Sequence, residues 1–195
     1  MRICPVCGEL CDYDITSDTS KCRQCTWTYD ESEEANRKAV YAGSFDPFTN
    51  GHLYIIQEAS EMFDKVYVLI ANNANKKRST NTEEMAEAIA KTMFHEGLFN
   101  VCIVIYDGLV ADFCLDNNVE YLIRGLRNTS DYLYEENIAK INHEINPNLK
   151  TIYYRANNDV VSSSLVREML SYGKDIDKYV PEEVAILLND EGEDF

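Results

Sequence analysis

A histidine stands in a turn that joins an apolar segment to a helical pattern. From Ala42 to His52 the chain reads Ala-Gly-Ser-Phe-Asp-Pro-Phe-Thr-Asn-Gly-His, and an amphipathic pattern follows. The backbone N–H groups at the start of such a helix lack partners and lie at the positive end of the helix dipole, so they can bind phosphate. The imidazole would lie beside them. These residues make nucleotide chemistry the first hypothesis.

Four of the seven cysteines form two closely spaced pairs, Cys4-x-x-Cys7 and Cys22-x-x-Cys25. Each pair can present two thiolates to one tetrahedral ion, and we predict a structural metal site. Zn²⁺ is the expected ion, and iron is the alternative because Cys-Pro-Val-Cys-Gly is similar to a rubredoxin knuckle. A disulfide-bonded or redox segment is the other interpretation. It is disfavoured because cytoplasmic thiols stay reduced and no thioredoxin-like unit surrounds the pairs.

Three further groups could bind an anion. Arg124 and Arg127 follow an apolar segment, and guanidinium groups fork onto phosphate oxygens. Three serines from Ser162 to Ser164 precede an amphipathic helix, where a single serine would suffice as a cap. A basic cluster, Asn75 to Arg78, follows another apolar segment. Surface salt bridges, a helix cap and a solvated loop are the respective alternatives.

An alternation of apolar strands and amphipathic helices must position these groups. The strands are expected at Ala39 to Ala42, Val66 to Ala71, Val101 to Tyr106, Tyr121 to Ile123 and Thr151 to Tyr154. The helices are expected near Leu53 to Met62, Glu83 to His95, Leu109 to Asp116, Asp131 to Ile141 and Leu165 to Leu170. This order predicts an α/β fold, a Rossmann-like doubly wound sheet of five parallel strands with helices on both faces. The ligand crevice should lie beyond the carboxyl ends of the strands.

The composition changes along the chain divide it into four parts. Residues 1–29 are predicted to form a small Cys4 zinc ribbon, too short to bury a core without its ion. Residues 30–38 form a charged linker, and residues 39–188 form the α/β domain. Residues 189–195 form an acidic tail.

The charge balance limits the partners of the chain. Eighteen Lys and Arg residues against 34 Asp and Glu residues give a formal net charge of −16, which repels nucleic acid and anionic membranes. No apolar stretch approaches the roughly 20 residues that cross a bilayer, and the N-terminus lacks a signal-peptide pattern. We expect a soluble, cytoplasmic protein with no nucleic-acid or membrane partner.

The motifs together resemble the phosphopantetheine adenylyltransferase family. Thr49-Asn50-Gly51-His52 is similar to the (Thr/His)-x-Gly-His signature of the nucleotidyltransferase superfamily. Leu-Ile-Arg-Gly-Leu-Arg, Asp-Tyr-Leu-Tyr-Glu and Ser-Ser-Ser-Leu-Val-Arg-Glu follow in the family's order, and the resemblance covers Lys38 to Leu188. It implies transfer of the adenylyl group of ATP to 4′-phosphopantetheine, giving dephospho-coenzyme A and pyrophosphate, with Mg²⁺ bound to the ATP. It also implies a homohexamer.

The resemblance implies a role for each matching residue. His52 would be catalytic and would stabilise the transition state, and Ser44 and Phe45 would contact both ATP and the acceptor. The acceptor would also be held by Lys76, Val110 and Arg124. The remaining ATP contacts would be Gly125, Leu126, Arg127, Glu135, Asn158, Asp159, Val160, Val161, Ser162, Ser163 and Ser164.

The chain departs from the family pattern in two places near the expected site. No proline follows the lysine pair in the loop from Asn73 to Asn81, and Lys77 is an alternative to Lys76. Asn157 or Asn158 stands where the family often has an aromatic residue. Two other functions stay open: nucleotidyl transfer to another phosphorylated acceptor, such as nicotinamide mononucleotide, and a non-catalytic metal-ribbon interaction module on a nucleotide-binding domain.

Overall fold

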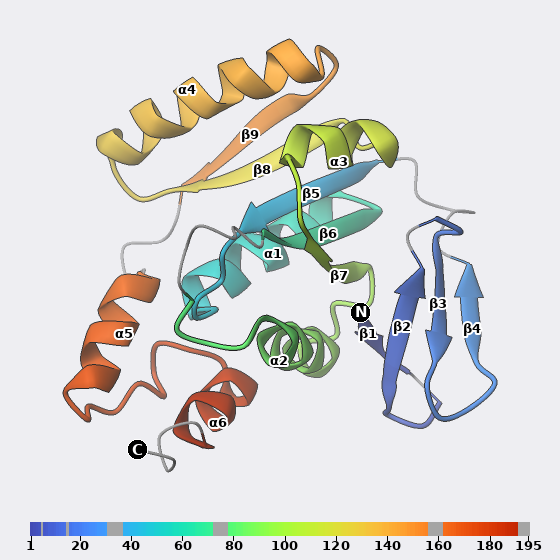
Figure 1. Cartoon of the computed structure of the whole chain (residues 1–195), viewed down its shortest axis with the longest axis vertical. Coiled ribbons are helices and arrows are strands. Elements are labelled where there is room, and N and C mark those ends of the chain that lie inside the picture. Colours follow the sequence, from blue (N-terminus) through green and yellow to red (C-terminus); the bar gives the residue numbers. More distant parts are fainter. Residues whose placement is uncertain (5, 15, 31–36, 72–77, 156–161, 191–195) are drawn as a thin grey trace.

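The computed structural model describes residues 1–190 except 5, 15, 31–36, 72–77 and 156–161. Its first 30 residues contain a four-stranded antiparallel sheet, hereafter the ribbon, in the order β1-β2-β3-β4. The strands are β1 (Arg2–Ile3), β2 (Leu10–Asp14), β3 (Thr19–Cys22) and β4 (Thr28–Asp30). Cys4 and Cys7 lie in the β1–β2 connection, Cys22 ends β3, and Cys25 lies in the β3–β4 connection. Figure 1 shows the ribbon beside the main sheet, near β7 and α2.

The main sheet has five parallel strands in the order β7-β6-β5-β8-β9, as the sequence predicted. The strands are β5 (Lys38–Gly43), β6 (Lys65–Ala71), β7 (Val101–Tyr106), β8 (Tyr121–Leu126) and β9 (Lys150–Arg155). The chain extends the sheet from β5 through β6 to β7 and then returns to place β8 on the other side of β5. The carboxyl ends of β5 and β8 therefore form a topological switch point, where ligands of such sheets bind.

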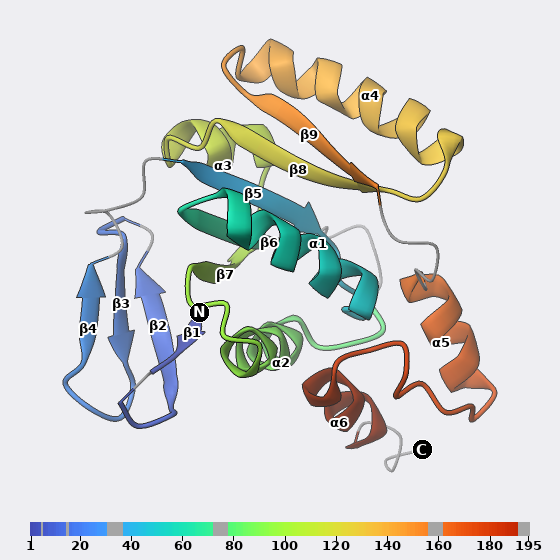
Figure 2. The same ribbon diagram turned by 180° about the vertical axis from the view of Figure 1, so that it is seen from behind.

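Helices cover both faces of this sheet (Figures 1 and 2). They are α1 (Asn50–Met62), α2 (Thr82–His95), α3 (Val110–Asp116), α4 (Thr129–Ile145), α5 (Ser163–Ser171) and α6 (Glu182–Asp190). Successive residues of β5 face opposite sides: Tyr41 packs with α1 and α2, whereas Val40 and Ala42 pack with α3. The first five helices match the predicted ones. Helix α6 was not predicted, and it includes Asn189 and Asp190 of the expected acidic tail.

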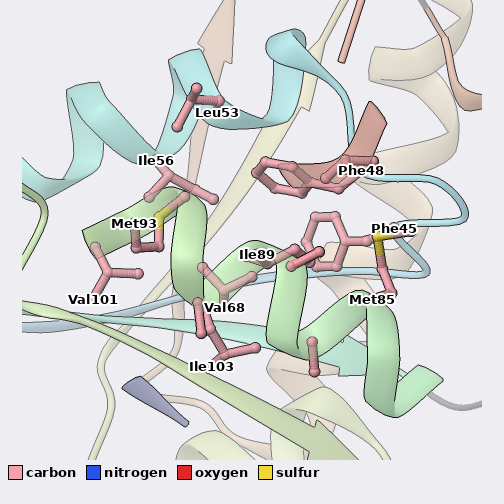
Figure 3. Close-up of a cluster of buried hydrophobic side chains, with 14 of the residues drawn as sticks. Phe45, Phe48, Leu53, Ile56, Val68, Met85, Ile89, Met93, Val101 and Ile103 are labelled. Atoms are coloured by element: carbon pink, nitrogen blue, oxygen red, sulfur yellow. The ribbon is translucent and has the colours of Figure 1, made fainter. Parts of the chain in front are cut away.

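Two phenylalanines of the turn before α1 are buried in the core. Phe45 and Phe48 pack among α1, α2 and the sheet, close to Met85 and Ile89 (Figure 3). Their exposed fractions are 2% and 0%. Burial of a side chain of this size stabilises a fold by about 1.5–3 kcal/mol. The burial of these two phenylalanines in the core therefore anchors the turn that carries Ser44.

The ribbon packs tightly against the α/β part of the chain. Ile3 and Leu10 belong to the same buried cluster as α1 and α2. At the β2–β3 turn, Asp18 accepts hydrogen bonds from Lys65 Nζ at 2.5 Å and Lys38 Nζ at 3.4 Å. The backbone N–H of Ile103, on edge strand β7, donates to the Met1 carbonyl oxygen at 3.2 Å. Within the described ranges no helix is long and apolar enough to cross a bilayer.

Candidate active site

A cavity of about 350 Å³ opens at the carboxyl ends of β5 and β8. Its wall combines residues from three stretches of the chain that are far apart in the sequence, 41–55, 124–135 and 162–167. They are Tyr41, Ala42, Gly43, Ser44, Phe45, Gly51, His52, Ile55, Arg124, Gly125, Arg127, Glu135, Ser162, Ser163, Ser164 and Arg167. Most of the predicted site residues therefore share one cavity. Leu126 and Val110 lie outside its wall, and Lys76, Asn158, Asp159, Val160 and Val161 fall outside the described residues.

The His52 ring is oriented by the cap of its own helix. The backbone N–H of Thr49 donates to His52 Nδ1 at 3.0 Å, within a capping box at the start of α1. Because Nδ1 accepts this bond, the neutral ring carries its proton on Nε2. Burial, and then the nearby Arg127 cation, lower the pKa of His52 to about 4. At neutral pH the ring is therefore uncharged and has one N–H to donate.

Arg124 is held rigidly within β8. Its Nε and Nη2 donate to the two carboxylate oxygens of Glu135 at 2.6 and 2.5 Å, and its Nη1 donates to the Ala42 carbonyl oxygen at 2.8 Å. This bidentate pair fixes the plane of the guanidinium. Glu135 is buried on α4, and its carboxylate orients the arginine.

A glycine permits the close approach of α1 and β8. A Cβ atom on Gly125 would lie 2.4 Å from Ile55 Cδ1, so a larger residue would have to displace the end of the Ile55 side chain. Ile55 lies one turn after His52 on α1, and both residues line the cavity with Arg124 and Arg127 of β8. Arg127, at the end of the strand, pairs with Asp131 at 2.9 Å and is half-exposed. Its side chain is more exposed than that of Arg124, 46% against 22%, which leaves it room to turn toward a ligand.

Each of the three serines has a different partner. The Ser162 hydroxyl caps α5 by accepting from the backbone N–H of Leu165 at 3.2 Å. Ser163 Oγ donates to the Pro47 carbonyl oxygen at 2.8 Å, and Ser164 Oγ accepts from Arg167 Nη2 at 3.2 Å. Arg167 was not among the predicted site residues, although it lines the cavity. Its position one turn after Ser163, on the same helix face, is the signal that could have found it.

The turn before α1 is held by the loop from Arg78 to Thr80. The Asp46 carboxylate accepts from the backbone N–H and hydroxyl of Ser79 at 3.1 and 2.7 Å, and from those of Thr80, both at 3.1 Å. Burial alone would raise the pKa of Asp46. The bonds from Ser79 and Thr80, and the charge of Arg78, outweigh it and lower that pKa. Sequence reasoning missed this contact because no local spacing links the two segments.

The sulfur atoms of Cys4, Cys7, Cys22 and Cys25 all lie within 4.8 Å of one another. The Sγ–Sγ distances are 3.7 Å for Cys4 and Cys25 and 3.4 Å for Cys7 and Cys22. Four sulfurs about 2.3 Å from one tetrahedral ion would be separated by about 3.8 Å, whereas a disulfide requires about 2.05 Å. Backbone N–H groups of Cys25 and Gln24 lower the pKa of the Cys22 thiol to about 6. The cluster could therefore hold a thiolate-binding metal.

Residues 40–169 match the cytidylyltransferase-like family, which is the class that the parallel sheet and its crevice define. The chain is 38% identical to phosphopantetheine adenylyltransferase of Petrotoga mobilis over 79% of this chain and 95% of the relative. It is 40% identical to the Streptococcus pneumoniae protein of the same name over 82% of this chain and 99% of the relative. The chain belongs to the phosphopantetheine adenylyltransferase family.

A solved structure supports the fold independently. A chain assigned as a nicotinate-nucleotide adenylyltransferase from Vibrio parahaemolyticus superposes with a TM-score of 0.61 at 21% identity. The match covers 80% of this chain and 93% of that chain. At this identity the likeness concerns the arrangement of helices and strands alone.

Proposed function

We propose that this protein transfers the adenylyl group of ATP to 4′-phosphopantetheine, giving dephospho-coenzyme A and pyrophosphate in coenzyme A biosynthesis. The observation that carries the proposal is one cavity in which a neutral imidazole, two arginines and a serine-rich helix N-terminus converge. The two relatives reported above are named for this activity, and the chain matches nearly their whole length. Positively polarised groups around one cavity suit a triphosphate and a phosphate acceptor.

The reaction would be an in-line displacement at the α-phosphorus of ATP. An oxygen of the acceptor phosphate forms a bond to that phosphorus, and the bond to the oxygen that bridges the α- and β-phosphates breaks, so pyrophosphate leaves with the electron pair. His52 Nε2–H would donate to the α-phosphoryl oxygens, where negative charge builds. The acceptor phosphate is already ionised at neutral pH. Positioning and charge stabilisation are therefore sufficient, and no general base is needed.

Two sets of residues, some of them in the cavity wall, would hold the two substrates. Arg124, fixed by Glu135, would set the acceptor phosphate together with Lys76 or Lys77, and Val110 would contact the pantetheine arm. Ser163, Ser164 and Arg127 would hold the β- and γ-phosphates, near the N-terminus of α5. The ATP contacts would be completed by Ser44, Phe45, Gly125, Leu126, Glu135, Ser162 and the segment from Asn158 to Val161.

Two metals belong to the proposal. Mg²⁺ would accompany the triphosphate and neutralise part of its charge. Zn²⁺ in the ribbon would be structural, because four thiolates close its coordination sphere and leave no position for a substrate. The subunits would assemble as a homo-oligomer, a hexamer by family resemblance.

The proposal is tested by pyrophosphate release from MgATP with 4′-phosphopantetheine. We expect release with this acceptor and at least about tenfold lower kcat/KM with nicotinamide mononucleotide, nicotinate mononucleotide or a polyol phosphate, because their phosphates are attached to different groups. CTP in place of ATP checks the nucleotide. Tight MgATP binding without release on any acceptor would favour the non-catalytic binding module instead.

A further inference from the structure

Arg78 directs its side chain toward the turn that carries Ser44 and Phe45. Its Nη1 donates to the Ser44 carbonyl oxygen at 2.8 Å, and its Nε donates to the Thr80 carbonyl oxygen at 3.4 Å. This residue is the last of the basic cluster that was expected either as a solvated loop or as a source of a lysine for the ligand. Arg78 fits neither expectation, because its guanidinium binds the backbone of the turn that carries Ser44 and Phe45.

The turn and the loop hold each other in both directions. The Asp46 carboxylate, on the turn, accepts from the backbone N–H groups and hydroxyls of Ser79 and Thr80. The Arg78 guanidinium, on the loop, donates back to the carbonyl of Ser44. Neither segment can rotate its peptides without breaking charge-assisted hydrogen bonds. The orientation of the Ser44–Phe45 peptide is therefore fixed by Arg78.

This orientation determines where the Phe45 N–H points. The peptide between Ser44 and Phe45 is trans, so its C=O and N–H lie on opposite sides. Because the carbonyl faces Arg78, the N–H faces away from that guanidinium. Both residues line the cavity, and the hydrogen bonds of the described residues leave this N–H unused. Phe45 is only 2% exposed, and its φ of +46° is a left-handed conformation that the surrounding packing maintains.

Fold stability alone does not account for an arginine at this position. Arg78 Nη2 is buried and makes no hydrogen bond to any part of the chain that the structure describes. A buried N–H without a partner carries a free-energy cost, which a smaller apolar side chain would avoid. The favourable Ser44 contact is offset by this cost. Removal of the guanidinium should therefore change the site more than it changes the free energy of unfolding.

We propose that Arg78 is a positioning residue that keeps the Phe45 N–H directed into the cavity as a donor to a phosphate oxygen of the nucleotide. The charge of the guanidinium also polarises the shared peptide, which strengthens the N–H as a donor. The inference rests on the proposed function only in its choice of a nucleotide phosphate as the ligand.

The test compares Arg78→Met and Arg78→Lys with Arg37→Met as a matched control. The Arg37→Met substitution also removes one guanidinium charge, but from a largely exposed side chain that pairs with Asp64. We expect Arg78→Met to weaken MgATP binding about tenfold in calorimetry, the effect of one such hydrogen bond. Its Tm should stay within about 2 °C of wild type. Arg78→Lys should restore binding to within about threefold, since an ammonium can also donate to the carbonyl, and Arg37→Met should bind like wild type.

A spectroscopic readout separates positioning from a general loss of structure. The chain has seven phenylalanines, so ¹⁵N-phenylalanine labelling gives a simple amide spectrum in which Phe45→Tyr identifies the Phe45 signal. MgATP or pyrophosphate should move this signal downfield in wild type and in Arg78→Lys, but not in Arg78→Met. Equal binding and an equal shift in Arg78→Met would overturn the role of Arg78.

Failure of the proposed function gives a different pattern. A wild-type protein that binds MgATP without transferring it to any acceptor would refute the adenylyl transfer, and binding and the Phe45 shift would still decide the role of Arg78. A wild-type protein that binds neither MgATP nor pyrophosphate would refute the donor role of the Phe45 N–H itself.

Discussion

The tautomer of one histidine decides what the cavity can do. Because Thr49 occupies Nδ1, His52 offers a hydrogen-bond donor and no base toward the cavity. A donor is suited to charge that develops on phosphoryl oxygens, whereas a base would have no proton to remove from an ionised phosphate. The sequence identified His52 through a four-residue motif. The tautomer and the burial follow from the cap and the rings of Phe45 and Phe48, which pattern alone does not reveal.

Replacement of His52 by alanine should therefore reduce turnover without removing the nucleotide site. We expect kcat to fall by about 10²-fold or more, the cost of one transition-state donor, while the Kd for MgATP changes by less than about threefold. Pyrophosphate release and calorimetry measure the two effects. The exposed His143 on α4 provides the control, since His143→Ala removes an imidazole far from the cavity. A His52→Ala protein with near wild-type kcat would exclude this role.

The same histidine should make stability depend on pH. The pKa of His52 is about 4 in the folded protein and near 6.5, the ordinary value for histidine, in the unfolded chain. Between these values the unfolded chain binds a proton that the folded chain does not, so the contribution of His52 is full above pH 6.5 and is lost as pH falls toward 4. We expect the Tm of wild type to fall between pH 7 and 4.5 by more than that of His52→Gln. Parallel curves for the two proteins would show that the ring is not buried in its neutral form.

At the scale of elements, binary patterning accounts for the sheet and for five helices. The run from Val66 to Ile70 is buried on both faces, and the run from Val101 is buried as far as Ile103 and half-buried beyond it, so both sequences are apolar throughout. Strand β8 extends further than predicted, to Leu126, because pairing with β9 continues past the polar Arg124. Helix α6 was missed although Val184, Ala185 and Leu188 form a buried stripe against α2. The predicted domain reached Leu188 but included no predicted helix after Leu170, and the last two residues of α6 were assigned to the acidic tail.

The ribbon as an element should depend on its ion. We expect Cys22→Ser to lose the bound Zn²⁺ and to lower the Tm of the whole chain by several degrees, because Ile3 and Leu10 belong to the main core. Elemental analysis and thermal unfolding measure the two effects. Cys11→Ala is the matched control: Cys11 is buried in the same sheet but lies outside the four-cysteine cluster, so about one ion per chain should remain. Full metal content in Cys22→Ser would remove the proposed site.

At the scale of the whole molecule, contacts between distant segments are what the sequence left undetermined. The motifs around His52, Arg124 and Ser163 are local, and the rule for parallel sheets predicts that they meet at one edge. No local sequence pattern pairs Asp46 with Ser79, or Arg78 with Ser44, because these contacts depend on the final packing of α2 against the turn. The contacts of Asp18 with Lys65 and Lys38 were unpredicted for the same reason.

The hydrogen bond from Ile103 to Met1 lies on the outermost strand of the five, whose outer side has no further strand of the main sheet. An uncovered strand of this kind is a template on which another molecule can add its own strand. The first residues of the chain occupy part of that template. A shortened protein without them would therefore be prone to aggregate through its border strand, even with every residue of the cavity in place.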